Sequence, residues 1–232
     1  MIKKFLFSSL GIISISVLLT IIVFIESLAF VPWAPYFLIY AILAIAIPIY
    51  LKTYRFHSFK EVISKHAKII IILLIIAIAY EVIMDIIHST LLALYNAKGD
   101  PYYDFYAALE LLAQKAGEKF NISADTAIAI YGIYVIIWAP IGEELFYRGY
   151  VYGELREKYG EITALLISSF FFGIRHFTHF FFITPTPVIP AAWWAIHAFF
   201  FGFIMVYSYK KTDSLYPPML IHLITNLIST AI

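Results

Sequence analysis

Long, nearly uninterrupted runs of apolar residues alternate with short polar segments along the whole chain. A helix needs about 20 residues to cross the hydrocarbon core of a bilayer, and its backbone amides must be satisfied within the segment. The length of the runs therefore favours helix, although Phe- and Ile-rich stretches form strands in many soluble proteins. The pattern predicts seven membrane-spanning helices, at residues 5–28, 33–51, 68–94, 126–150, 162–183, 190–209 and 214–232.

Two connections between these predicted helices are longer than a turn. Segment 52–67 is basic but interrupted by apolar residues such as Phe56 and Phe59, so we expect it to lie along the membrane interface. Segment 102–119 is rich in Tyr, Phe and Leu, which predicts either an interfacial helix or an eighth helix that enters the membrane partway. The expected fold class is therefore all-α, a polytopic integral membrane bundle with 7–8 transmembrane helices.

The composition supports a membrane protein and excludes several other classes. The chain is 62% hydrophobic and 13% charged, whereas soluble domains are about 45–50% apolar and about 25% charged. A net charge of +1 provides no field to attract nucleic acid. The absence of cysteine excludes disulfides, thiolate metal sites and a cysteine nucleophile. The first apolar run exceeds the roughly 7–15 residues of a signal peptide, so we expect a retained span.

Basic residues gather in every second connection, and this asymmetry predicts the orientation. Lys and Arg are enriched in the cytoplasmic loops of membrane proteins. The pattern therefore predicts a multi-pass protein of the cell membrane with its N-terminus in the cytoplasm and its C-terminus outside. The basic positions are Lys3 and Lys4, then Lys52, Arg55, Lys60, Lys65 and Lys68, then Arg148, Arg156 and Lys158, and finally Lys210 and Lys211.

Charged residues within a predicted span are informative, because each costs about 2.5–3.5 kcal/mol at a helix centre. Glu144 and Arg148 are four residues apart, so they share a helix face and can pair. Glu143 points about 100° away from Glu144, so it does not take part in this pairing and is available for another function. Pro140 lacks a backbone N–H and Gly142 lacks a side chain, so together they are expected to open the helix beside Glu143. Alternatively, the pair is a buried salt bridge and Glu143 an interface residue.

Two further motifs place polar side chains at similar depth. His176 ends the motif Phe-Gly-Ile-Arg-His, and His179 follows one turn later. His222 and Asn226 lie four residues apart on one face of the last predicted span. An imidazole and an amide in this arrangement suit a base, a ligand or an oxyanion donor. Hydrogen bonds between helices are the alternative, and they are the favoured interpretation for His179.

Another polar set lies in the third predicted span. Glu81, Asp85 and His88 share one helix face, which must point to the bundle interior or to a water-filled cavity. Arg175 is a candidate partner for them. His197 follows two tryptophans near a helix end, a pattern typical of an interfacial anchor. A structural role is the favoured interpretation for all of these residues.

The motifs together resemble the CPBP family (CAAX protease and bacteriocin-processing, also called Abi), which includes the type II CAAX prenyl endopeptidases. The family pattern of Glu-Glu-x-x-x-Arg, Phe-x-x-x-His and His-x-x-x-Asn has its counterparts here in the same order and in successive spans. The resemblance covers residues 126–230, so we assign 126–232 to the catalytic core and 1–125 to N-terminal membrane helices and interfacial segments of one integrated domain. The matching motifs are Glu143-Glu144-x-x-x-Arg148, Phe172-x-x-x-His176 and His222-x-x-x-Asn226.

The resemblance implies an intramembrane endopeptidase that acts near the membrane surface on prenylated CAAX-type or other membrane-associated peptides. In a metal-free version Glu143 is the general base for water, with His176 helping to hold that water. The implied catalytic residues are Glu143, Glu144, Arg148, His176, His222 and Asn226, with the last two as oxyanion donors. In a metal version, Glu143, His176 and His222 form a set suited to zinc. The sequence leaves both versions open.

Two other functions remain open from the sequence. A transporter or proton relay also buries acidic residues and histidines, but such proteins often have two related halves, and no internal repeat is present. A non-catalytic immunity or scaffold protein of the same fold is the second alternative. It predicts that function survives the loss of Glu143.

Overall fold

The computed structural model describes residues 2–29 and 34–231. This part of the chain is helical and contains no strand, which confirms the all-α prediction. The first residue of the predicted helix 33–51 and the last residue of 214–232 lie outside it. The helices are α1 (Ile2–Leu6), α2 (Ser9–Ala29), α3 (Ala34–Leu51), α4 (Phe59–Tyr95), α5 (Phe105–Phe120), α6 (Ala124–Ile133), α7 (Ala139–Glu143), α8 (Gly153–Tyr159), α9 (Glu161–Phe177), α10 (Val188–Thr212) and α11 (Tyr216–Ala231).

The predicted number of spans is only partly supported. Within the described residues, five helical stretches are long and apolar enough to cross a membrane. The 16-residue α11 is shorter than the length that a full crossing needs, whereas α3 has 18 residues. The structure thus supports a multi-pass membrane protein without establishing seven or eight crossings. The five stretches are Ser9–Ser27, Phe59–Tyr95, Ala124–Tyr159, Glu161–Phe182 and Val188–Thr212.

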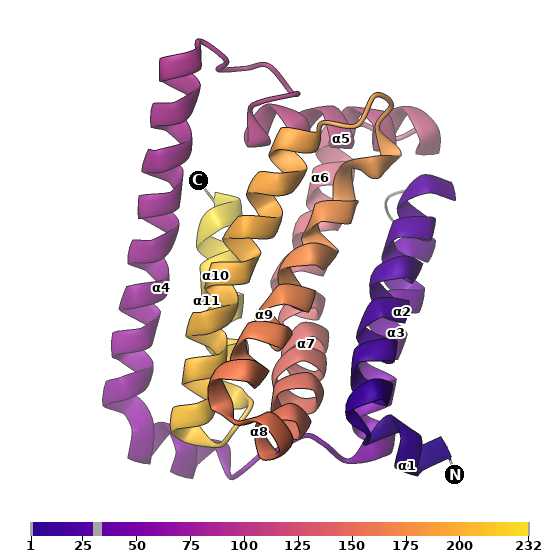
Figure 1. Cartoon of the computed structure of the whole chain (residues 1–232). Helices are drawn as coiled ribbons and strands as arrows, with labels where there is room; N and C mark the ends of the chain where they lie inside the picture. Colours follow the sequence, from indigo (N-terminus) through magenta and orange to yellow (C-terminus); the bar gives the residue numbers. More distant parts are fainter. Residues whose placement is uncertain (1, 30–33, 232) are drawn as a thin grey trace.

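The helices form an upright bundle in which α4 stands at one edge and the α2–α3 pair at the other (Figure 1). Helices α9 and α10 pack against each other between these edges, and α11 packs against both α4 and α10. The end of the bundle that carries the N-terminus also holds α8 and the α10–α11 connection. We call it the basic end, because Lys3, Lys4, Arg156, Lys158 and Lys210 lie there.

Both long connections contain helix. Helix α5 covers most of segment 102–119 and lies across the end of the bundle opposite the N-terminus (Figure 1), as the interfacial alternative predicts. It buries Ala108 and Leu112 against Phe180, and the side chain of Asp104 caps its first turn. Segment 52–67 differs from its prediction, since α4 begins at Phe59 and continues without a break for 37 residues. At 1.5 Å per residue it is about 55 Å long and exceeds the hydrocarbon core.

Glycines allow the close packing of α9 on α10. A Cβ built on Gly173 would lie 2.7 Å from the Ala195 carbonyl oxygen, and one on Gly202 would lie 2.8 Å from Ser169 Oγ. Backbone cannot move aside cheaply, so the first contact prevents any larger residue from occupying that position without a shift of the helices. Small residues at such crossings are common in membrane bundles, where packing drives association.

We therefore expect Gly173→Ala to lower the free energy of unfolding by about 1–3 kcal/mol, the usual cost of overpacking. Gly132→Ala in α6 is the matched control, since a Cβ there meets nothing within 4 Å. It should leave stability equal or raise it by about 0.5–1 kcal/mol through helix propensity. Unfolding in mixed detergent micelles measures both. Equal effects of the two substitutions would contradict the close packing.

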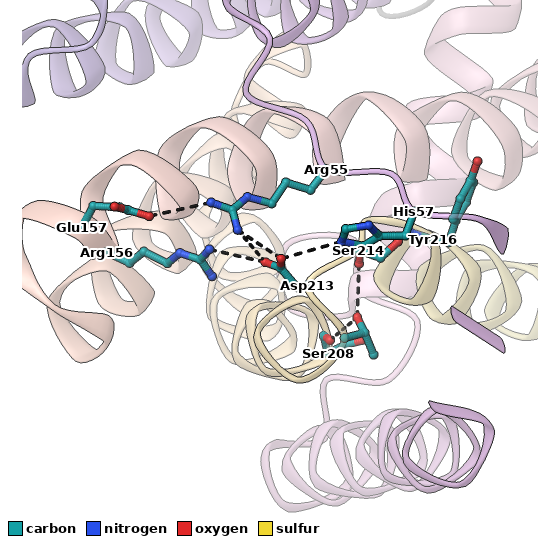
Figure 2. A network of polar contacts seen from close by, with 9 residues as sticks. Arg55, His57, Arg156, Glu157, Ser208, Asp213, Ser214 and Tyr216 are labelled. Atoms are coloured by element: carbon teal, nitrogen blue, oxygen red, sulfur yellow. Dashed lines mark hydrogen bonds and ion pairs between the residues drawn. The ribbon is translucent and has the colours of Figure 1, made fainter. Parts of the chain in front are cut away.

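A polar network closes the basic end (Figure 2). Asp213 follows α10 with a positive φ of 48° and accepts hydrogen bonds of 2.9 and 3.1 Å from Arg55. A third bond of 3.4 Å comes from Arg156, and His57 lies 3.7 Å away. Partial burial alone would raise the pKa of Asp213, but the bonds from the two arginines outweigh it and hold this pKa below its usual value. The network ties the 53–58 connection to α8 and the α10–α11 turn.

Candidate functional site

The helix that carries the Glu-Glu motif opens on both sides of Glu143, as its Pro and Gly predict. The five-residue α7 ends at Glu143 and lies between two wider π-helical stretches, η1 (Tyr134–Trp138) and η2 (Glu144–Tyr152). Pro140 has no N–H to continue a regular ladder. Wide turns of this kind are frequently found at functional sites. The opening places consecutive glutamates inside the bundle, where both are almost completely inaccessible.

Glu144 holds two predicted site residues. Its Oε2 lies 3.2 Å from Arg148 Nε, which confirms the predicted pairing along the helix. Its Oε1 lies 2.8 Å from His222 Nδ1 on α11. A carboxylate can only accept here, so Nδ1 carries the proton and donates it. Arg148 itself is fully buried and rests over the Phe172 ring, with its guanidinium carbon 4.4 Å from the ring centre.

Glu143 pairs with Arg175, which was a candidate partner for Glu81, Asp85 and His88. Arg175 Nη2 donates to Glu143 Oε1 at 2.5 Å and to His176 Nε2 at 2.8 Å. His176 Nδ1 faces the Phe172 carbonyl oxygen at 2.7 Å. This nitrogen therefore carries the proton, and His176 is a neutral imidazole whose second nitrogen is occupied by Arg175.

The second oxygen of Glu143 points to the remaining histidine. Glu143 Oε2 lies 3.9 Å from His222 Nε2, too far for a direct hydrogen bond but within the span of one bridging water. Two carboxylate–arginine pairs thus lie side by side, and each also holds a histidine. Between the two pairs, Glu143 Oε2 and His222 Nε2 face each other.

Comparison with known proteins fits this geometry. Residues 125–228 match the family described as Type II CAAX prenyl endopeptidase Rce1-like. The match supports the resemblance of this part of the chain to the CPBP family of CAAX proteases. Members are membrane-embedded proteases, which implies a lipid bilayer and a peptide substrate. Neither the search of curated proteins nor that of solved structures returned a match. The matched range nearly coincides with the expected core, and it contains all three motifs.

The CPBP motif residues, as arranged, do not fit a zinc ion. The predicted ligands are Glu143, His176 and His222, but Arg175 Nη2 lies against the first two of them. A guanidinium in this position repels a cation and occupies the nitrogen that His176 would offer. No group of three His, Asp or Glu side chains within the described residues is arranged to hold a metal ion.

Asn226 is the remaining predicted site residue. It is one turn beyond His222 on α11 and lines a neighbouring cavity together with Glu81, Asp85 and His88. His179, for which a structural role was favoured, stacks on the His176 ring with the centroids 5.3 Å apart.

The position of Arg175 corrects one expectation. It was a candidate partner for the Glu81 set, but it binds Glu143, while Glu81 Oε2 lies 3.0 Å from His197 Nε2. His197 is therefore also more than an aromatic anchor. The pairing of Arg175 with Glu143 could have been predicted from the sequence. A buried arginine needs a carboxylate, and Glu143 was the acidic residue left over once Glu144 had paired with Arg148.

Proposed function

We propose that the protein is an intramembrane endopeptidase in which Glu143 activates the water that cleaves a peptide bond. The observation that carries the proposal is the arrangement around this carboxylate. Glu143 is buried at a helix opening, Arg175 fixes one of its oxygens, and the other faces His222 Nε2 across 3.9 Å. A water between these two acceptors would donate one hydrogen to each. Its lone pair would then be directed at a carbonyl carbon.

The proposed reaction uses the described residues in sequence. The water oxygen bonds to the peptide carbonyl carbon while its proton passes to Glu143 Oε2. Asn226 is proposed to stabilise the resulting oxyanion, a role that stays a prediction. Collapse of the tetrahedral intermediate breaks the C–N bond, and the proton held by Glu143 moves to the leaving amine. His222 is oriented throughout by Glu144, and Glu144 by Arg148.

Arg175 is a positioning residue in this scheme. It determines which oxygen of Glu143 is free, and it ties the neutral His176 to the same guanidinium. These contacts support different roles for the two histidines. His222 keeps a free nitrogen towards the proposed water, whereas His176 supports Arg175.

The test is cleavage of a quenched fluorescent peptide by the purified protein in detergent. One peptide carries a farnesylated CAAX end, and its control has the same sequence without the prenyl group. We expect cleavage that persists with a strong zinc chelator, because Arg175 occupies the position between two of the candidate ligands. Faster cleavage of the farnesylated peptide assigns the substrate class. Complete loss of cleavage with chelator, restored by added zinc, would contradict the metal-free scheme.

We further propose that the basic end faces the cytoplasm of a cell-membrane protein. The chain contains no cysteine, so single cysteines can be introduced without removing any. Ser58 and Lys98 are exposed near opposite ends of α4. In intact cells, a membrane-impermeant maleimide should label Lys98→Cys at once and Ser58→Cys only after permeabilisation. The reverse pattern would overturn the orientation.

A further inference from the structure

A cavity of about 190 Å³ lies beside the proposed active site, towards the end of the bundle covered by α5. Residues from α4, α5, α6, α10 and α11 line it. The proposed reaction uses one of them, Asn226. The other lining residues take no part in that reaction, and the polar set on α4 determines the chemistry of the cavity.

The cavity is acidic. Glu81 and Asp85 stand one turn apart on α4, and no Lys or Arg is among the lining residues. Asp85 Oδ1 accepts a hydrogen bond of 2.9 Å from the Tyr106 hydroxyl, which is a neutral partner. His88 Nε2 accepts from the Phe105 N–H at 3.2 Å, so this ring is neutral in that arrangement. Only His197, beside Glu81, can supply a positive charge against two carboxylates.

The remaining walls are aromatic. Trp193 lies 5.1 Å from the His88 ring, and Tyr106 lies 5.8 Å from it on another side. Trp194 and Phe105 pack together with their centroids 5.4 Å apart. Faces of aromatic rings attract ammonium groups, most strongly where a carboxylate is also near. The cavity is larger than one water needs and has room for a small headgroup.

We propose that this cavity binds the protonated amine of a small ligand, either the headgroup of an aminophospholipid or a free amine such as ethanolamine. The proposal goes beyond the proteolytic function and does not depend on it. The two features nevertheless share a wall. The Trp194 ring lies 5.3 Å from that of His176 and 4.4 Å from that of His179, so an occupied cavity contacts the surroundings of the proposed site.

Tryptophan fluorescence provides a readout that needs no protease substrate, since two of the chain's four tryptophans line the cavity. We expect a saturable change when ethanolamine is added to the protein in detergent, and none with ethylene glycol, its neutral counterpart. Asp85→Asn keeps an acceptor for Tyr106 and removes the charge. It should weaken binding about tenfold, the value of one charged contact. Asp125→Asn, at an exposed position on α6, is the matched control and should bind as the parent does.

Lipid nanodiscs distinguish the two sources. If the ligand is a lipid headgroup, nanodiscs of phosphatidylethanolamine should give the shifted spectrum without added amine, and added ethanolamine should have little further effect. If it is a free amine, discs of phosphatidylethanolamine and phosphatidylglycerol should give the same spectrum, and ethanolamine should shift both. An equal response to ethylene glycol, an unchanged affinity of Asp85→Asn, or no response in detergent and in both discs would overturn the proposal.

Discussion

Glu143→Gln is expected to lower the rate of peptide cleavage about a thousandfold, within the range that general-base catalysis contributes. The amide keeps the shape of the side chain but cannot accept the proton of the attacking water. The free oxygen faces His222 Nε2, and no other carboxylate oxygen described at the site is left in that position. The initial rate on the farnesylated fluorescent peptide measures the effect. Glu110→Gln, at an exposed position on α5, should cleave at the parent rate.

The same substitution also removes the anion beside Arg175. An unpaired buried charge costs about 3–5 kcal/mol, so a loss of activity could reflect a loss of fold. The double variant Glu143→Gln/Arg175→Gln removes both charges and should recover most of the stability. It should remain as inactive as the single variant. A folded single variant that cleaves at the parent rate, or a double variant that regains activity, would show that Glu143 is not the base.

The sequence predicted the helices well, because lipid leaves few alternatives to a helix for a long apolar run. It predicted less well how many of these helices cross the membrane. Helix α11 has 16 residues, fewer than a full crossing needs, so an apolar run marks a helix without determining that it crosses the membrane. The start of α4 was also missed. Basic residues near Phe59 resemble an interfacial connection, yet they continue the helix beyond the membrane.

For the site, sequence spacing was sufficient where both partners lie on one helix. Glu144 and Arg148 are four residues apart, and their pairing follows from helix geometry. The bonds from Arg175 to Glu143 and from His222 to Glu144 join different helices. They depend on how each helix is rotated and tilted, which tertiary packing decides. The motifs therefore indicated which residues gather, whereas the proposed division of roles between the two histidines rests on their observed contacts.

Arg148→Met is expected to lower the free energy of unfolding by about 3–5 kcal/mol, because it leaves Glu144 as a buried carboxylate without its arginine. Arg148 has no solvent exposure, and it also lies over the Phe172 ring and 3.5 Å from the Gly202 carbonyl oxygen. Unfolding by denaturing detergent, followed by far-ultraviolet circular dichroism, measures the loss. Arg156→Met is the matched control, because its partner Asp213 is 47% exposed. Such a pair is worth at most about 1 kcal/mol.

The double variant Glu144→Gln/Arg148→Met separates the charge pair from simple packing. If the loss in Arg148→Met comes from the unpaired carboxylate, removing that charge should restore most of the stability. If it comes from lost contacts with Phe172 and Gly202, the two losses should add. Cleavage gives an independent reading, because Glu144 also holds His222 Nδ1. We expect the double variant to be stable but slow, since His222 would lose the carboxylate that orients it. Stability and activity that recover together would limit Glu144 and Arg148 to a structural role.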